Sequence, residues 1–147
     1  MTDTRDLRVT EEILIRAAPE KVFRALVDPA ELATWWRIPG RYETQNAQVD
    51  LRVGGAYSLT GTSVARRQFL VTGEYLLIDP PHRLRYTWNP DWDDEAHGSI
   101  VDFTLEAAGE KTRLVVEHTA FSSRAAFEAH RQGWPAVLAA LSAHMSH

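Results

Sequence analysis

His118 is the residue in this sequence that could place acid–base chemistry inside the fold. It ends the alternating segment LVVEH, on the same side of a strand as Leu114 and Val116, and a histidine there could act as a general base near neutral pH. A general base also needs an orienting carboxylate, but Asp102 and Glu117 fall on the opposite side of their strands. We therefore favour a neutral His118, hydrogen-bonded to backbone or to an indole near a cavity mouth, and keep the catalytic role as the alternative.

Metal and cofactor chemistry find no support in the sequence motifs. The acidic loop 91–97, DWDDEAH, gathers oxygen atoms that could hold calcium, but it lacks the DxDxDG spacing, so a solvated hairpin tip is the better interpretation. No HExxH pair suggests zinc, and no Walker, GxGxxG or GxSxG motif occurs. The lack of cysteine excludes disulfides and thiolate ligands. We predict no metal and no cofactor.

Aromatic side chains recur on the predicted inner face of the sheet and on the last helix. Each could belong to an ordinary core, since aromatic residues dominate packing, or could contact a ligand. The set is more informative than its members, because tyrosine hydroxyl and indole N–H groups in an apolar wall suit a preformed pocket. The predicted ligand-binding set is Trp35, Trp36, Tyr57, Phe69, Tyr75, Tyr86, Trp88, Phe103, His118, Phe121, Trp134 and Leu138.

Consecutive strands must position these side chains. The turns between them are short and rich in Gly, Pro and Asp, which is typical of an antiparallel meander. Alternation places Leu84, Tyr86 and Trp88 on one face, so that face is predicted to be apolar and aromatic. Gly73, in mid-strand, leaves space or lets the sheet bend. The predicted strands are 8–16, 48–53, 56–63, 66–78, 83–89, 99–108 and 112–121.

Helices should cover the apolar face of the sheet. The spacing of apolar residues predicts two short helices, at 19–27 and 30–36, and one long helix at 123–145. Ser122 or Ser123 can cap the long helix. A proline inside a helix costs about 3 kcal/mol, so Pro135 should produce either a kink or a short first helix with a fresh start near Gly133.

Length and charge narrow the class of protein. The chain has 147 residues, of which 44% are hydrophobic, and we predict one globular domain over 1–147. The net charge of -4 favours neither nucleic acid nor an anionic membrane as a partner, and Arg66–Arg67 is better explained as charge that guards a strand edge. No apolar run is long enough for membrane insertion and the N-terminus shows no signal peptide, so a cytoplasmic location is expected.

Four phrases in this order carry a resemblance to a known superfamily: APEKVFRALVDPAELATWW, DLRVGGAYSL, VTGEYLLIDPPHRLRYTW and TRLVVEHTAF. Over nearly its whole length the chain resembles the START-like (SRPBCC) superfamily. Within it, the chain is similar to the group named after the C-terminal domain of the activator of the ninety-kilodalton heat-shock protein ATPase. The resemblance implies an α+β helix-grip fold, with a curved antiparallel sheet around a long C-terminal helix and two short helices after the first strand. It also implies a cavity that relatives use for lipids, sterols or polyketides, but no single chemistry.

Three functions follow as hypotheses. The first is non-catalytic binding of a small, largely apolar molecule, such as a lipid, polyketide or aromatic metabolite. The second is an enzyme of the cyclase or aromatase type, which requires His118 to face open volume within reach of Tyr86 or Tyr75. The third is a co-chaperone that stimulates a heat-shock-protein ATPase, although the partner-binding N-terminal domain of the eukaryotic activators is not in this sequence. A homodimer through an exposed aromatic patch stays open.

Overall fold

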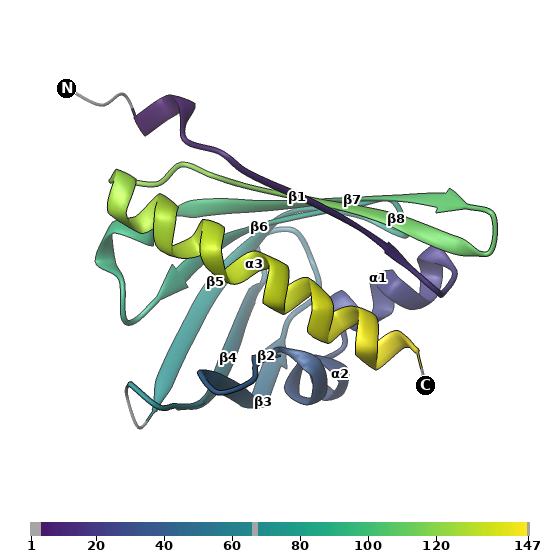
Figure 1. Ribbon diagram of the computed structural model, residues 1–147, viewed down its shortest axis with the longest axis horizontal. Helices are drawn as coiled ribbons and strands as arrows, with labels where there is room; N and C mark the ends of the chain where they lie inside the picture. Colours follow the sequence, from purple (N-terminus) through teal and green to yellow (C-terminus); the bar gives the residue numbers. More distant parts are fainter. Residues whose placement is uncertain (1–3, 66–67, 147) are drawn as a thin grey trace.

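The computed structural model describes residues 4–65 and 68–146, in which a long helix lies across a curved sheet (Figure 1). Helices α1 (Pro19–Val27) and α2 (Pro29–Trp35) follow the first strand, and α3 (Arg124–Met145) follows the last. This arrangement confirms the predicted α+β helix-grip fold. The other elements are η1 (Thr4–Asp6), β1 (Val9–Ile15), β2 (Arg37–Ile38), β3 (Tyr42–Val49), β4 (Ala56–Ser63), β5 (Phe69–Asp79), β6 (Arg83–Pro90), η2 (Asp94–Ala96), β7 (Ser99–Ala108) and β8 (Lys111–Thr119).

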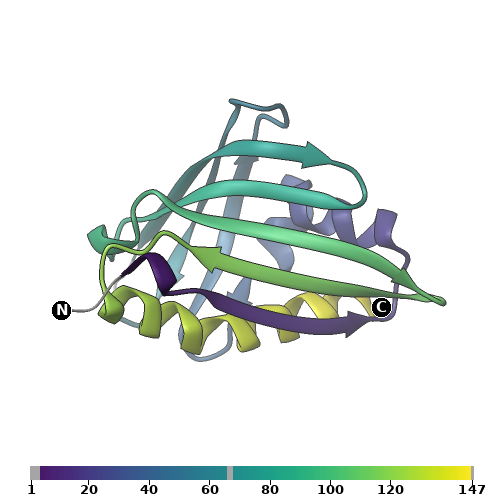
Figure 2. The same cartoon turned by 90° about the horizontal axis from the view of Figure 1, so that it is seen from above.

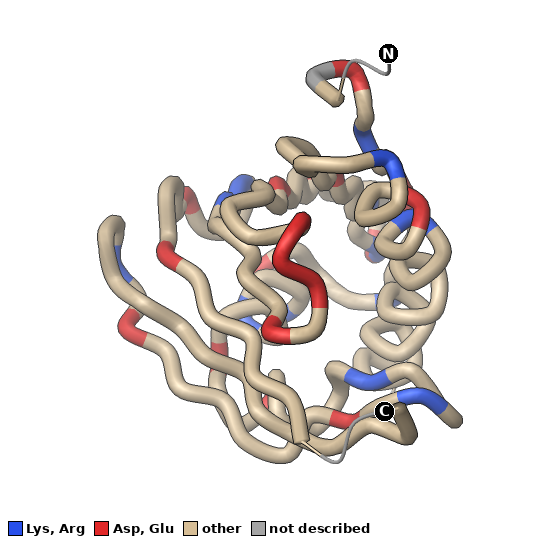
Figure 3. The backbone as a smooth tube through the Cα atoms, turned by 90° about the vertical axis from the view of Figure 1, so that its left-hand side faces the viewer, with Lys and Arg blue, Asp and Glu red and all other residues tan. Residues whose placement is uncertain are grey.

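The strands form one eight-stranded sheet in the order β1-β8-β7-β6-β5-β4-β3-β2. Neighbouring strands pair antiparallel, and the meander predicted from the short turns is confirmed from β3 to β8. The first strand pairs with the last, so β1 and β2 form the two edges. From above, the strands curve over α3 (Figure 2), and the end-on view shows sheet and helix around a shared interior (Figure 3).

Local irregularities allow the sheet to bend. The pairing register shifts once in β3 and once in β5, and such bulges increase local twist. In β5, a Cβ added to Gly73 would lie 2.0 Å from the Thr87 carbonyl oxygen and 2.3 Å from the Tyr57 ring. The Tyr57 ring therefore occupies the space that a side chain at position 73 would need, which explains the mid-strand glycine.

The two short helices share a boundary at Asp28. The Asp28 carboxylate accepts the backbone N–H of Glu31 over 3.0 Å and caps α2. Pro19 and Pro29 occupy the first turns of α1 and α2, where a missing N–H is harmless. One face of α1 is buried against the core.

Helix α3 runs without interruption from Arg124 to Met145, so the predicted alternative of a fresh start near Gly133 is wrong. Pro135 lies inside it and is exposed, while Trp134 and Val137 on either side are buried. The helix stays continuous because both halves bury apolar side chains in the same core, which outweighs the hydrogen bond lost at proline. The Ser123 hydroxyl accepts the Ala126 N–H over 3.1 Å, so Ser123 is the cap.

The predicted strand at 48–53 is wrong in its position, because β3 spans Tyr42–Val49. Residues 50–55 form a turn instead, held by a 2.9 Å hydrogen bond from the Asp50 N–H to the Ala56 carbonyl. Gly54 takes a φ of +86° there, which favours glycine. The register shift inside β3 disturbs the alternation that would have revealed the strand. Arg66–Arg67 lie outside the described residues.

Alternation places the inner face of the sheet correctly in the regular strands. Tyr86 and Trp88 of β6 are buried, and so are Val116 and His118 of β8. These side chains face α3 and form the core together with it. None of the helices in the described ranges has the length and apolar character needed to cross a membrane.

Candidate functional site

A cavity of about 430 Å³ lies between α3 and the sheet. One wall is supplied by Ala129, His130, Gly133, Trp134 and Val137 of α3. These positions recur at the three- and four-residue intervals that place side chains on one helix face. The middle of α3 therefore presents one continuous face to the cavity.

The opposite wall is strongly aromatic. Trp36 and Trp88 stack with ring centroids 5.6 Å apart and an interplanar angle of 20°, and Trp134 meets Trp36 edge-on at 6.0 Å. Phe69 meets Trp92 edge-on at 5.8 Å. The residues of this wall are Trp36, Ile38, Arg41, Tyr42, Ser63, Val64, Ala65, Phe69, Trp88 and Trp92.

The structure divides the predicted set between the cavity and the core behind it. Trp36, Phe69, Trp88 and Trp134 line the cavity. In the core, a polar side-chain group is hydrogen-bonded within the protein. The Tyr57 hydroxyl donates to the Thr87 carbonyl over 2.7 Å, and burial raises the pKa of Tyr57 well above its usual range. The predicted residues buried in the core are Trp35, Tyr57, Tyr75, Tyr86, Phe103, His118, Phe121 and Leu138.

His118 is 0% exposed and both of its ring nitrogens are hydrogen-bonded. The Trp134 indole N–H donates to Nδ1 over 3.0 Å, so the proton of the neutral ring is on Nε2. Nε2–H donates to the Ser99 hydroxyl over 2.8 Å, and that hydroxyl donates to the Trp88 carbonyl over 3.3 Å. Burial, assisted by the nearby His130, lowers the pKa of His118 well below its usual value. The geometry is that of the neutral, indole-bonded histidine favoured above.

His130 lines the cavity and was not identified from the sequence. Its Nδ1–H donates to the Ala126 carbonyl over 2.9 Å, because a carbonyl oxygen only accepts, and its Nε2 accepts the Trp88 indole N–H over 3.1 Å. Burial lowers the pKa of His130. The signal that could have found it is its spacing, one helical turn before Trp134 on the same face of α3.

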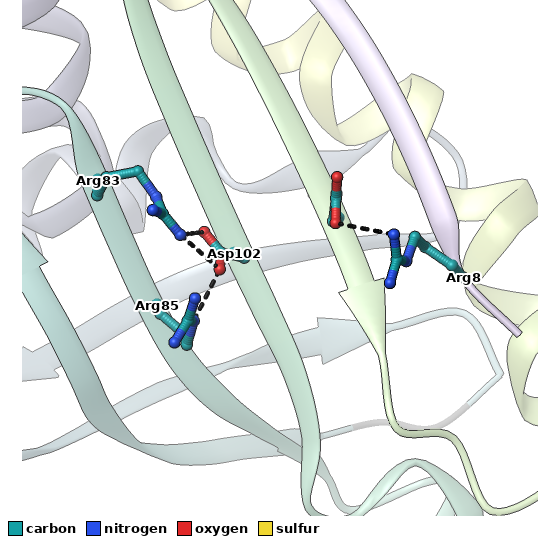
Figure 4. Close-up of polar contacts among 5 residues, drawn as sticks. Arg8, Arg83, Arg85 and Asp102 are labelled. Atoms are coloured by element: carbon teal, nitrogen blue, oxygen red, sulfur yellow. Dashed lines mark hydrogen bonds and ion pairs between the residues drawn. The ribbon is translucent and has the colours of Figure 1, made fainter. Parts of the chain in front are cut away.

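The carboxylates next to His118 in the sheet lie on its outer face. Asp102 accepts hydrogen bonds from Arg83 at 2.9 Å and from Arg85 at 2.7 Å (Figure 4). Glu117 forms an exposed ion pair with Arg8 at 3.8 Å. Within the described residues, neither ring nitrogen of His118 is hydrogen-bonded to a carboxylate, which leaves the ring without the partner that a general base uses for orientation.

Arg41 and Tyr42 supply polar groups to the cavity and were also missed. The Trp36 indole N–H donates to the Tyr42 hydroxyl oxygen over 2.9 Å, and burial raises the pKa of Tyr42 above its usual range. Both residues lie where β3 begins, in the stretch whose alternation is disturbed by the bulge. The sequence held no signal for them.

A second hollow of about 810 Å³ lies beside the C-terminal end of α3. Its lining includes Arg16, Lys21, Glu31 and His144. Glu31 is already engaged, by His144 at 2.9 Å and by Arg24 at 3.4 Å. This hollow is larger but charged and lacks aromatic walls, so we assign the candidate site to the aromatic cavity.

The acidic loop organises its own backbone. Asp93 caps η2, where its carboxylate accepts the Glu95 N–H over 3.1 Å. The His97 ring donates from Nε2 to the Pro90 carbonyl over 2.7 Å. In residues 4–65 and 68–146, no group of three or more His, Asp or Glu side chains is arranged to hold a metal ion.

A curved antiparallel sheet around a long C-terminal helix, with a cavity between them, defines the START-like (SRPBCC) class of proteins. The model of the family described as activator of Hsp90 ATPase homolog 1-like protein matches residues 16–146, and the chain belongs to this family. An uncharacterized protein of Schizosaccharomyces pombe is 26% identical over 106 residues, which is 72% of this chain. The chain spans only 27% of the length of that relative.

Solved structures show the same fold. A protein from Chromobacterium violaceum is 27% identical, with a TM-score of 0.84 over 96% of this chain and 98% of its own. The AHSA1 protein from Silicibacter pomeroyi is 26% identical, with a TM-score of 0.79 over 95% of this chain and 97% of its own. The AHSA1-like protein from Aeromonas hydrophila is 23% identical, with a TM-score of 0.77 over 95% of this chain and 92% of its own.

Proposed function

We propose that this protein binds a small, largely apolar molecule in the cavity between α3 and the sheet. The observation that carries the proposal is an aromatic cavity of about 430 Å³, a volume typical of small-molecule sites. Trp36, Phe69, Trp88 and Trp134 form its walls. These four side chains are already largely buried, so an apolar ligand would mainly remove from water the exposed lining of Val64 and Trp92. Burial of such apolar surface is the main driving force for binding of this kind.

The aromatic walls favour a ligand with an aromatic ring. Trp36 stacks on both Trp35 and Trp88, so a ligand would meet ring edges and the exposed Trp92 rather than open indole faces, and aromatic rings also pair favourably edge-on. At the mouth, Val64 is 81% exposed and Trp92 is 41% exposed, although both line the cavity. A bound ligand would cover part of this exposed apolar surface.

The site supports binding better than acid–base catalysis. The cyclase hypothesis requires His118 to face open volume beside a tyrosine, but His118 is sealed and bonded to Trp134 and Ser99. His130 does face the cavity, yet both of its ring nitrogens are also engaged. A ring with both nitrogens committed has no free position from which to take a substrate proton.

Gly133 gives a direct test of the cavity. A Cβ at this position would meet only the Ile38 methyl, at 3.8 Å, so the space beside it is open. Replacing Gly133 with Leu places an apolar side chain in the cavity and narrows it, while improving the helix propensity of α3 by roughly 1 kcal/mol. The matched control is Ala139→Leu, at an exposed position of the same helix.

Titration calorimetry with a panel of fatty acids and fused-ring aromatic compounds measures the effect. We expect wild type and Ala139→Leu to bind members of the panel, and Gly133→Leu to bind them roughly tenfold more weakly or worse. A bound ligand at one hundred times its Kd should also raise the free energy of unfolding by about 2.7 kcal/mol. Equal affinities of Gly133→Leu and wild type would place binding elsewhere and contradict the proposal.

Stimulation of a chaperone ATPase is a second candidate, and the family match is the observation that favours it. It is tested by the ATPase rate of purified Hsp90 with and without an equimolar amount of this protein. An unchanged rate would remove this candidate and leave the cavity proposal standing.

A further inference from the structure

The described residues that line the aromatic cavity include a positively charged side chain but no negatively charged one. Among its described lining residues, Arg41 is the one side chain with a permanent charge, and no Asp or Glu is present. His130 is the other titratable base, and burial lowers its pKa so that it is neutral at pH 7. The described lining therefore places a cation, Arg41, at the cavity and no carboxylate beside it.

The guanidinium of Arg41 has no carboxylate partner within the described part of the fold. Arg83 and Arg85 share Asp102, and Arg113 pairs with Glu12 and Glu106. Arg41, in contrast, forms no ion pair with any residue in 4–65 or 68–146. Its hydrogen bonds there are made by its backbone: its N–H donates to the Ile38 carbonyl and its carbonyl accepts from the Val64 N–H.

Tyr42 supplies a second donor to the same cavity. Its hydroxyl oxygen accepts the Trp36 indole N–H over 2.9 Å, which leaves its own O–H proton to be donated. Burial raises the pKa of Tyr42, so the hydroxyl keeps that proton. Tyr42 pairs with Ser63 and the Arg41 backbone is hydrogen-bonded to Val64, so both residues lie beside the end of β4 that lines the cavity.

We propose that the ligand of this cavity is an organic acid: a flat apolar body lies among the indoles, and its anionic group meets Arg41 and the Tyr42 hydroxyl. This inference rests on the proposed function and adds the chemical class of the ligand. A guanidinium and a hydroxyl donor together match a carboxylate, which accepts and does not donate. The apolar walls strengthen the attraction, because a charge pair interacts more strongly where water is excluded.

Calorimetry with a matched pair of probes tests the inference. 2-Naphthoic acid and 2-naphthamide share the same flat body, and only the acid is charged at pH 7. We expect wild type to prefer the acid by about tenfold, the value of one charge-assisted hydrogen bond. Arg41→Gln should abolish the preference without weakening the amide, and Arg41→Lys should retain part of it.

Arg52→Gln is the control, because Arg52 is exposed in the turn at the opposite end of the β3–β4 hairpin and pairs with Asp50. It should keep the full preference for the acid, and added salt should reduce that preference in wild type. Equal binding of acid and amide by wild type, or a preference that survives Arg41→Gln, overturns this inference while the cavity proposal stands. Failure of both probes to bind wild type counts instead against the proposed function.

Discussion

The side chains of His118 and His130 are held as neutral rings by the indoles that contact them. Trp134 donates to Nδ1 of His118 and Trp88 donates to Nε2 of His130. Protonating either ring would place an N–H opposite an indole N–H, so the hydrogen bond would be lost as the charge was buried. The two ring centroids are also only 5.1 Å apart, which disfavours two positive charges.

This pair predicts that the protein loses stability in acid. Burial lowers the pKa of both rings in the folded state, whereas an unfolded histidine titrates near its ordinary pKa of about 6.5. The unfolded chain therefore binds more protons below that pH, and the stabilisation present above it is lost as the pH falls. Urea unfolding from pH 8 to pH 5 should show the free energy of unfolding declining by up to about 1.4 kcal/mol per pH unit for each ring.

The variant that checks this assignment is His118→Gln. It removes one of the two groups, so the decline below pH 6.5 should become shallower whatever the variant does to stability at pH 8. An unchanged slope would mean that His118 takes up no extra proton on unfolding.

Helix α3 carries a local cost at Pro135 that the rest of the element outweighs. Because Pro135 is exposed and inside the helix, Pro135→Ala should restore a backbone donor without changing the core. We expect the free energy of unfolding to rise by about 2 kcal/mol, since the helical gain exceeds the entropy that alanine returns to the unfolded chain. Chemical denaturation measures it, and a stability at or below wild type would show that the helix needs proline at this position.

At Gly73 of β5 we expect a substitution to lower the free energy of unfolding, in contrast to Pro135→Ala. A Cβ there would overlap the Thr87 carbonyl and the Tyr57 ring, so Gly73→Ala should lower the free energy of unfolding by about 3 kcal/mol or more. The matched control is Gly133→Ala, where the added methyl meets only ordinary contact and should stabilise α3 by roughly 1 kcal/mol. Thermal and urea unfolding of both variants should move in opposite directions; a Gly73→Ala protein as stable as wild type would contradict the packing described.

Elements were predictable from sequence where alternation or helical spacing was regular. The limits of β4 and β7 were predicted as the structure has them, and His118 was placed on the inner face by parity alone. Parity failed in β3, because a bulge breaks the two-residue period. Of the two outcomes predicted at Pro135, the fresh start near Gly133 is wrong, because a local cost does not reveal how much burial the helix gains on either side.

At the scale of the whole molecule, the division between core and cavity could not be predicted. Trp35 and Trp36 are adjacent and both are buried, yet Trp36 lines the cavity while the Trp35 indole donates to the Ala25 carbonyl over 2.8 Å. Trp35 ends α2 and bonds to α1, whereas Trp36 caps the helix and bonds to Tyr42 of β3, so the difference depends on how α2 packs between these elements. Arg41 likewise lines the cavity because of how the start of β3 is placed in three dimensions, which no sequence pattern indicates.

The stacked pair of Trp36 and Trp88 has one more consequence. Two indoles with centroids 5.6 Å apart and planes 20° from parallel are close enough for their electronic transitions to couple. Such coupling produces a paired band in circular dichroism whose sign and size depend on the angle between the rings. Because both rings belong to the cavity wall, a molecule that enters the cavity and shifts either one changes that band. The circular dichroism of the unlabelled protein should therefore report whether a ligand occupies the cavity.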